Sequence, residues 1–165
     1  MLYTIENSEI RVQISDMGAE LQSICLKADG SEYLWQGDKT FWSGRAYNLF
    51  PICGRLSEGK YTYAGKTYEM NLHGFARKTA FEAVDQGPDS ISFHLAASEA
   101  SLAQYPFQFD LTLHYQLEGT GVRTTFIVKN LDEKTMIFAV GGHPGFQVPL
   151  TKGEAFEDYY LEFDC

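Results

Sequence analysis

The chain lacks several features that mark whole classes of protein. None of its apolar runs approaches the roughly 18 residues that cross a bilayer, so no membrane-spanning helix is expected. Acidic side chains outnumber basic ones by 22 to 13, and the formal charge of -9 repels phosphate backbones. No polybasic cluster favours a lipid surface. Neither nucleic acid nor a membrane is therefore expected as a partner.

Cysteine is also scarce. Cys25, Cys53 and Cys165 form an odd set without the CxxC spacing of a metal or redox site. Reduced thiols in a cytoplasmic protein are the natural interpretation, and neither a metal nor another cofactor is expected. The start of the chain, residues 1–7, lacks a basic segment followed by an apolar core, so no signal peptide is expected.

Apolar and aromatic side chains are plentiful. The 165 residues are 44% hydrophobic and 15% aromatic, which is enough for a sizeable core and argues against disorder. The length suits one domain over residues 1–165.

Alternation of polar and apolar residues is the dominant pattern. Residues 9–15, 109–117 and 122–128 alternate as half-buried strands do, and Glu118-Gly119-Thr120-Gly121 predicts a hairpin turn. Further strands are expected at 19–26, 61–63, 66–70, 80–84, 90–95, 134–140 and 159–163. A single short helix is expected from Ser98, a possible N-cap, to Gln104. The pattern predicts an all-β sandwich or barrel.

Three segments combine glycine with polar and aromatic side chains: 48–56, 71–77 and 141–146. The last follows an apolar run, 136–140, that predicts a buried strand, and it holds His143 between glycines and Pro144. A histidine at a strand end is suited to proton transfer near neutral pH, although a structural histidine bonded to backbone is the alternative. Polar groups beside flat apolar faces suit a sugar.

These segments resemble the aldose 1-epimerase family, also called galactose mutarotases, and most closely its LacX-like branch. The resemblance is carried by Phe-Pro-Ile-Cys-Gly-Arg-Leu at 50–56, the predicted hairpin at 61–68, His-Gly-Phe-Ala-Arg at 73–77 and Gly-His-Pro-Gly-Phe at 142–146. It implies a large antiparallel β-sandwich of the galactose mutarotase-like supersandwich type. It also implies an isomerase that interconverts the α and β anomers of a hexose by opening its ring.

The resemblance assigns roles to single residues. His143 is the expected general acid, which protonates the ring oxygen, and His73 is expected to act beside it. The expected substrate-binding residues are Arg55, Arg77, Asn48, Phe75 and Phe146. Either arginine could instead form an ordinary ion pair, and Arg77 would also suit a hexose phosphate. Other aromatic residues in the segment 35–60, which shows no sustained period, could belong to the core or to a stacking floor.

Family members are longer, and the resemblance places their general-base glutamate in the C-terminal half. No acidic residue here lies in a matching segment, so we expect the domain to be incomplete at its C-terminus. Loss of a general base removes on the order of 10²- to 10⁴-fold of rate. Open sheet edges should also favour self-association. Two alternatives stay open: a carbohydrate-binding module without turnover, and an inactive fragment.

Overall fold

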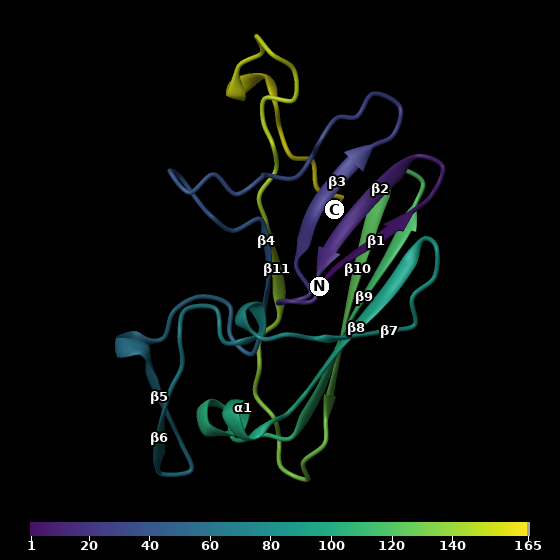
Figure 1. Cartoon of the computed structure of the whole chain (residues 1–165). Helices are drawn as coiled ribbons and strands as arrows, with labels where there is room; N and C mark the ends of the chain where they lie inside the picture. Colours follow the sequence, from purple (N-terminus) through teal and green to yellow (C-terminus); the bar gives the residue numbers. More distant parts are fainter. Residues whose placement is uncertain (165) are drawn as a thin grey trace.

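The computed structural model describes residues 1–164, and antiparallel strands make up most of its regular secondary structure (Figure 1). One sheet has three strands in the order β1-β2-β3, and the other has four in the order β10-β9-β8-β7. Their bounds are β1 Leu2–Glu6, β2 Ile10–Ser15, β3 Leu21–Leu26, β7 Glu82–Val84, β8 Ser90–Ala96, β9 Phe109–Glu118 and β10 Gly121–Asn130. The prediction of an all-β sandwich is confirmed.

Two short ladders lie beside these sheets. β4 (Ala46–Leu49) pairs with β11 (Gly141–Pro144), and β5 (Lys60–Tyr63) pairs with β6 (Lys66–Glu69). The predicted helix is confirmed as α1 (Glu99–Gln104). Three 3-10 turns complete the elements: η1 Ser57–Gly59, η2 Ala76–Lys78 and η3 Phe156–Asp158. Within residues 1–164, no helix has both the length and the apolar character needed to cross a membrane.

The core lies between the two large sheets, where the alternation of β9 decides which side chains are buried. Its inward residues are each at most 4% exposed: Phe109, Leu111, Leu113, Tyr115 and Leu117. They meet Ile5, Val12 and Ile14 of the other sheet, all at 0% exposure. Burial of each such aliphatic side chain contributes about 1.5–3 kcal/mol. The pairing of Gly121 with Glu118 confirms the predicted hairpin.

Two predicted strands are wrong. Residues 134–140 have irregular backbone, with Ile137 71% and Phe138 42% exposed. A short apolar run has no period that fixes its secondary structure, and here the ladder to β4 begins only at Gly141. Residues 159–163 are also irregular, because no described strand lies beside them to form a ladder. Conversely, β1 and β4 are strands that the sequence did not predict.

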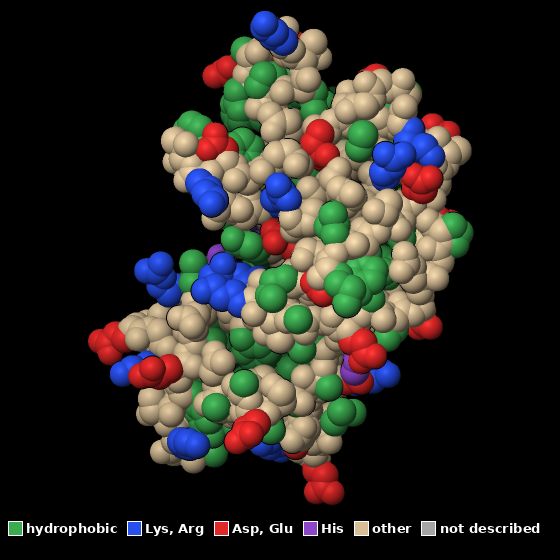
Figure 2. Space-filling view, viewed as in Figure 1, with side chains coloured by type: hydrophobic (Ala, Val, Ile, Leu, Met, Phe, Trp, Pro, Cys, Tyr) green, Lys and Arg blue, Asp and Glu red, His purple; other side chains and the backbone are tan. Residues whose placement is uncertain are grey.

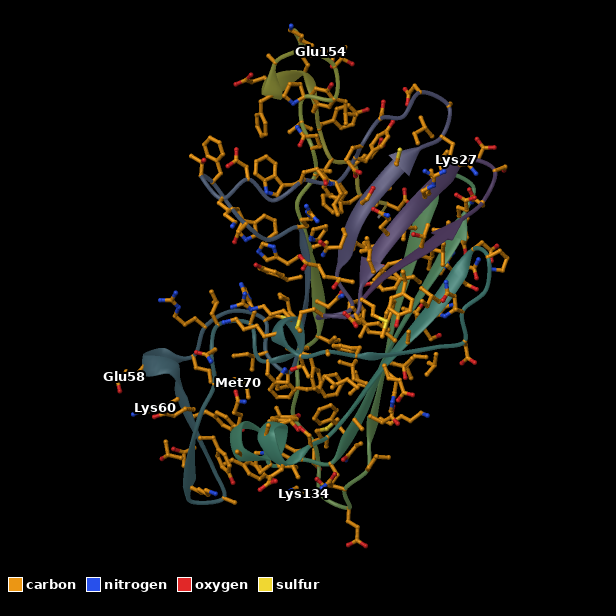
Figure 3. All side chains as sticks on the ribbon, in the orientation of Figure 1. Lys27, Glu58, Lys60, Met70, Lys134 and Glu154 are labelled. Atoms are coloured by element: carbon orange, nitrogen blue, oxygen red, sulfur yellow. The ribbon has the colours of Figure 1, made fainter. Side chains whose placement is uncertain are left out.

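The segment after β11 extends beyond the end of β3, turns at the top of the view and comes back toward β3 (Figure 1). Glu154 of this segment lies at one end of the molecule and Lys134 at the opposite end (Figure 3). Its large apolar side chains are mostly exposed, with Phe156 at 68% and Tyr160 at 83%. Cys25 and Cys53 are free thiols, while Cys165 lies outside the described residues.

Candidate functional site

The ladder between β4 and β11 positions His143. Its Cα pairs with that of Tyr47, and residues directly opposite in a ladder place their side chains on the same face. The sequence analysis placed His143 after a strand, whereas the structure places it inside one, with the glycines Gly141 and Gly142 in the same ladder. The ring of His143 is therefore held by strand geometry.

Aromatic rings surround His143. Its ring centroid lies 5.2 Å from that of Trp42 and 5.4 Å from that of His73. Trp42 also meets Tyr47 edge to face at 5.4 Å. A Cβ atom at position 145 would lie 2.8 Å from Cζ3 of Trp42, so the glycine there makes room for the indole. We call His73, His143, Trp42 and Tyr47 the ring cluster.

His73 is held by backbone contacts on its own loop. It adopts a left-handed conformation, with φ of 65°. Its amide donates to the carbonyl oxygen of Gly54 at 2.7 Å, and the Gly54 amide donates to Nδ1 of His73 at 3.1 Å. Because Nδ1 accepts a hydrogen bond from this amide, the neutral ring carries its own proton on Nε2. His73 is thereby prepared to donate a hydrogen bond through Nε2.

The environment of His73 favours that neutral form. Burial lowers the pKa of His73 below its usual value, and the neighbouring His143 and Arg77 lower it further. Desolvation and like charge both disfavour an imidazolium. The ring is therefore an uncharged donor at neutral pH.

The two predicted arginines have no ion-pair partner among residues 1–164. The Arg77 guanidinium lies 4.9 Å above the ring of Tyr47, and its Nε donates to the Leu72 carbonyl oxygen at 3.3 Å. Arg55 is exposed. In the space-filling view, basic side chains and a histidine gather where the surface is indented, between the 35–45 loop and the β5–β6 hairpin (Figure 2).

Three other predicted residues lie outside the ring cluster. Asn48 is 5% exposed, and its Nδ2 donates to the carbonyl oxygens of Gly18 and Ala19 and to the Tyr115 hydroxyl. Phe75 is 8% exposed and packs its ring against Phe50 in the core. Both side chains are buried, so they can hold the site residues in place but cannot contact a ligand on the surface.

Phe146 is 45% exposed and lines an apolar groove on the other side of Pro144. The structure therefore brings together His73, His143 and Arg77. It adds Trp42 and Tyr47, which the sequence analysis did not single out as site residues. Their place in the irregular segment 35–60 is the one sequence feature that pointed to them. The pairing of Tyr47 with His143 depends on strand β4, which the sequence does not predict.

A cavity of about 90 Å³ lies under β11 and is lined by His143 together with Thr124 and Phe126 of β10. Pockets for small ligands measure about 300–1,000 Å³, so a hexose does not fit in this cavity. A sugar would have to bind on the exposed side of His143, above the ring cluster.

Neither ring has a carboxylate within ion-pair distance in the described part of the chain. Neither His73 nor His143 forms an ion pair there, and residues 1–164 contain no group of three or more His, Cys, Asp or Glu placed to hold a metal. His94 does pair with Asp110 at 3.0 Å, but on the outer face of the four-stranded sheet.

Known proteins with similar sequences and folds come from one family. The family model described as aldose 1-epimerase matches residues 1–165. The plasmid-encoded protein LacX of Lactococcus lactis subsp. lactis is 41% identical over 169 residues, which cover 99% of this chain and 56% of that protein.

Solved structures that resemble this chain are galactose mutarotase-like proteins. A galactose mutarotase related enzyme from Lactobacillus acidophilus is 46% identical with a TM-score of 0.94, over 96% of this chain and 53% of that one. A galactose mutarotase-like protein from Lactobacillus casei is 41% identical with a TM-score of 0.88. The match covers 92% of this chain and 52% of that one. The chain thus spans about half the length of these relatives.

Proposed function

The chain belongs to the aldose 1-epimerase family, and on that premise we propose that it binds a hexose above the ring cluster and interconverts its anomers. The observation that supports this most directly is the pair of histidine rings, 5.4 Å apart, beside an aromatic wall and Arg77, which has no ion-pair partner among residues 1–164. Sugar sites need that combination of donors and flat apolar surface.

His143 is the general acid in this proposal. It gives a proton to the ring oxygen of the sugar while the bond from C1 to that oxygen breaks and a base removes the proton of the C1 hydroxyl. The resulting aldehyde rotates about C1–C2 and closes again on either face. Nε2 of His73 donates a hydrogen bond to a sugar oxygen, and Arg55 and Arg77 hold the hydroxyl groups. Phe146 borders the site, while Asn48 and Phe75 support it from beneath.

The base is the missing part of this mechanism. Neither histidine of the ring cluster pairs with a carboxylate among residues 1–164. The family resemblance assigns the base to a glutamate in the portion of the relatives that this chain does not match. With His143 alone, the rate enhancement should be lower by roughly 10²- to 10⁴-fold than with both groups.

The substrate follows from the relatives and from Arg77. Two of the solved relatives are described as galactose mutarotase-related or mutarotase-like proteins, which supports an aldohexose of the galactose type. The Arg77 guanidinium has no acidic partner in the part of the chain that the structure describes, and it would also suit a phosphorylated hexose, because arginine binds phosphate through paired hydrogen bonds. A cytoplasmic location stays a prediction from the sequence.

Carbohydrate binding without turnover is the second candidate function, and the missing carboxylate favours it. Polarimetry of freshly dissolved α-galactose or α-glucose separates the two. Faster decay of optical rotation in proportion to protein concentration supports the isomerase. If rotation decays at the spontaneous rate while sugar still shifts protein NMR signals saturably, the chain binds sugar and does not isomerise it.

A further inference from the structure

Trp35 and Trp42 are the two tryptophans of the chain, and their indole N–H groups differ in what they bind. Nε1 of Trp35 donates to the Trp42 carbonyl oxygen at 2.7 Å, so this hydrogen bond lies within the fold. Nε1 of Trp42 donates to no group among residues 1–164, although every buried side-chain nitrogen and oxygen in that range has a partner. The N–H of Trp42 is therefore open to solvent. A donor that the fold leaves unused at the surface is available to a ligand.

The backbone of Trp42 is fixed by hydrogen bonds although it lies in an irregular loop. Its amide donates to the Asp38 carbonyl oxygen at 2.8 Å, and its own carbonyl oxygen accepts the bond from Trp35. The Thr40 amide donates to the Asp38 carboxylate at 2.8 Å and closes the same turn. A side chain on a backbone that is already ordered loses less freedom when a ligand binds. The indole of Trp42 is thus preorganised.

Two glycines make room for the indole. A Cβ atom at position 44 would lie 2.7 Å from Cζ2 of Trp42, and one at position 145 would lie 2.8 Å from its Cζ3. Neither Gly44 nor Gly145 has a left-handed backbone, so conformation alone does not require glycine at either position. Close approach of a flat ring explains both glycines. The loop and β11 are therefore shaped around the side chain of Trp42.

The indole adjoins the place where a sugar would meet His143. It packs edge to face against Tyr47 at 5.4 Å, and its centroid lies 5.2 Å from that of His143. Trp42 is only partly buried, and its loop, residues 35–45, borders the indented surface (Figure 2). Because the cavity under β11 is too small for a hexose, a sugar at His143 lies on this open side. A hexose whose ring oxygen reaches His143 is then within reach of Trp42.

The two common aldohexoses differ in the apolar surface that they offer to a flat ring. In galactose the C4 hydroxyl is axial, so the C–H bonds at C3, C4 and C5 form one continuous apolar patch on the opposite face. In glucose the C4 hydroxyl is equatorial and the C4–H bond points to the other face, which interrupts this patch. An aromatic face binds the larger apolar patch more strongly, because more apolar area leaves water.

We propose that Trp42 is the sugar-stacking residue of this face and that it makes the site prefer galactose to glucose. Its indole packs against the C3–C5 patch of galactose, and its Nε1 donates a hydrogen bond to a hydroxyl group at the rim of the sugar. The ring oxygen of the same sugar faces His143. The inference rests on the hexose binding proposed above, and it does not require that the bound sugar be isomerised.

The test titrates the full chain with D-galactose and with D-glucose at equilibrium, and NMR measures both affinities. The parent should bind galactose more tightly. Trp42→Ala should weaken galactose binding at least about 10-fold, the scale of losing one stacked aromatic ring, and glucose binding by less. Trp42→Phe keeps a flat ring and loses one N–H donor, so it should weaken galactose binding only about 3-fold. The matched control is Phe41→Ala, at the preceding residue, which is 81% exposed and should stay within about 2-fold of the parent.

Indole fluorescence protects the test against misfolding of Trp42→Ala. Saturating galactose should change the emission of the parent and leave that of Trp42→Phe, which retains Trp35, unchanged. Galactose binding that Trp42→Ala does not weaken, equal losses for the two sugars, or an emission change that persists in Trp42→Phe would each overturn the assignment of Trp42 alone. If the parent binds neither sugar, the proposed hexose binding falls together with this assignment.

Discussion

Gly54 and His73 are joined by two hydrogen bonds that run in opposite directions. The His73 amide donates to the Gly54 carbonyl oxygen, and the Gly54 amide donates to the His73 ring. The second bond fixes the tautomer of the neutral ring, because only an unprotonated Nδ1 can accept it. A loop that looks irregular in sequence thus sets the proton position of a candidate site residue.

The His73 ring should titrate below the usual histidine pKa of about 6.5, because burial and the charges of His143 and Arg77 disfavour its protonation. Nitrogen-detected NMR should show the proton on Nε2 at pH 7. Arg77→Gln should raise the pKa of His73, since it removes one positive neighbour. Arg11→Gln, whose arginine pairs with Glu6 on β1, is the control and should leave it unchanged. A His73 pKa above that of a model peptide would contradict the structure.

The same shift makes stability depend on pH. The unfolded chain binds a proton at His73 more readily than the folded chain does, so the free energy of unfolding decreases as the pH falls through about 6.5. His73→Gln removes this contribution. Urea denaturation at pH 7 and pH 5.5 should show a smaller loss of stability on acidification in the variant than in the parent. An identical loss would mean that His73 is not the group responsible.

His143→Asn should abolish most of any acceleration of anomer exchange. Removal of a general acid lowers the rate by on the order of 10²- to 10⁴-fold, whereas asparagine keeps a polar group in the binding face. Polarimetry measures the rate, and sugar titration by NMR measures affinity, which should stay within about 3-fold if His143 acts only on the transition state. The matched control is His114→Asn, at a histidine that bonds to Ser92 on the outer face of the sheet. Equal rates for the parent and His143→Asn would refute the assignment.

Gly74 should not tolerate a side chain. A Cβ atom there would overlap the Phe50 carbonyl oxygen, on a backbone with φ of 74°. Gly65 has a similar φ of 76° but nothing within 4 Å of its Cβ position. Gly65→Ala should therefore lower the free energy of unfolding only by the cost of a left-handed backbone at alanine, about 1–2 kcal/mol. Gly74→Ala adds a clash, and we expect it to destabilise by more than about 3 kcal/mol in thermal or urea unfolding. Equal effects of the two variants would show that the approach to Phe50 is unimportant.

Asn48→Asp tests whether Asn48 is structural. The substitution replaces a buried amide donor by a carboxylate facing the Gly18 and Ala19 carbonyl oxygens, and we expect a loss of at least about 2 kcal/mol. Asn130→Asp, at an exposed amide that donates to Lys134, should cost less than about 1 kcal/mol. If Asn48→Asp instead folds normally and loses only sugar affinity, Asn48 contacts the substrate directly.

The sequence was most informative where alternation and turn residues act locally. The hairpin from Phe109 to Asn130 and the helix after Ser98 could be predicted because each is fixed by neighbours in the chain. The apolar run 136–140 could not, since a uniform run has no period. β4 could not either, because four residues within an irregular segment become a strand only through pairing with β11.

The candidate site shows the same limit. His73, His143 and Arg77 were found from residue chemistry and family resemblance, and the structure places them together. The sequence does not predict a site role for Trp42 and Tyr47, because their position depends on a cross-strand contact that no local pattern encodes. Closeness to His73 in sequence predicts a site role for Phe75, yet the turn at Gly74 directs its ring into the core.

The β4–β11 ladder has a consequence for the order of events during synthesis. Tyr47 leaves the ribosome long before His143, and the two can pair only after β7 to β10 have been made. Contacts between distant parts of a chain form slowly, because the intervening loop has to close first. The four-stranded sheet should therefore form from its own hairpin before β4 has paired with β11. The pair of histidines is among the last features of this molecule to be assembled.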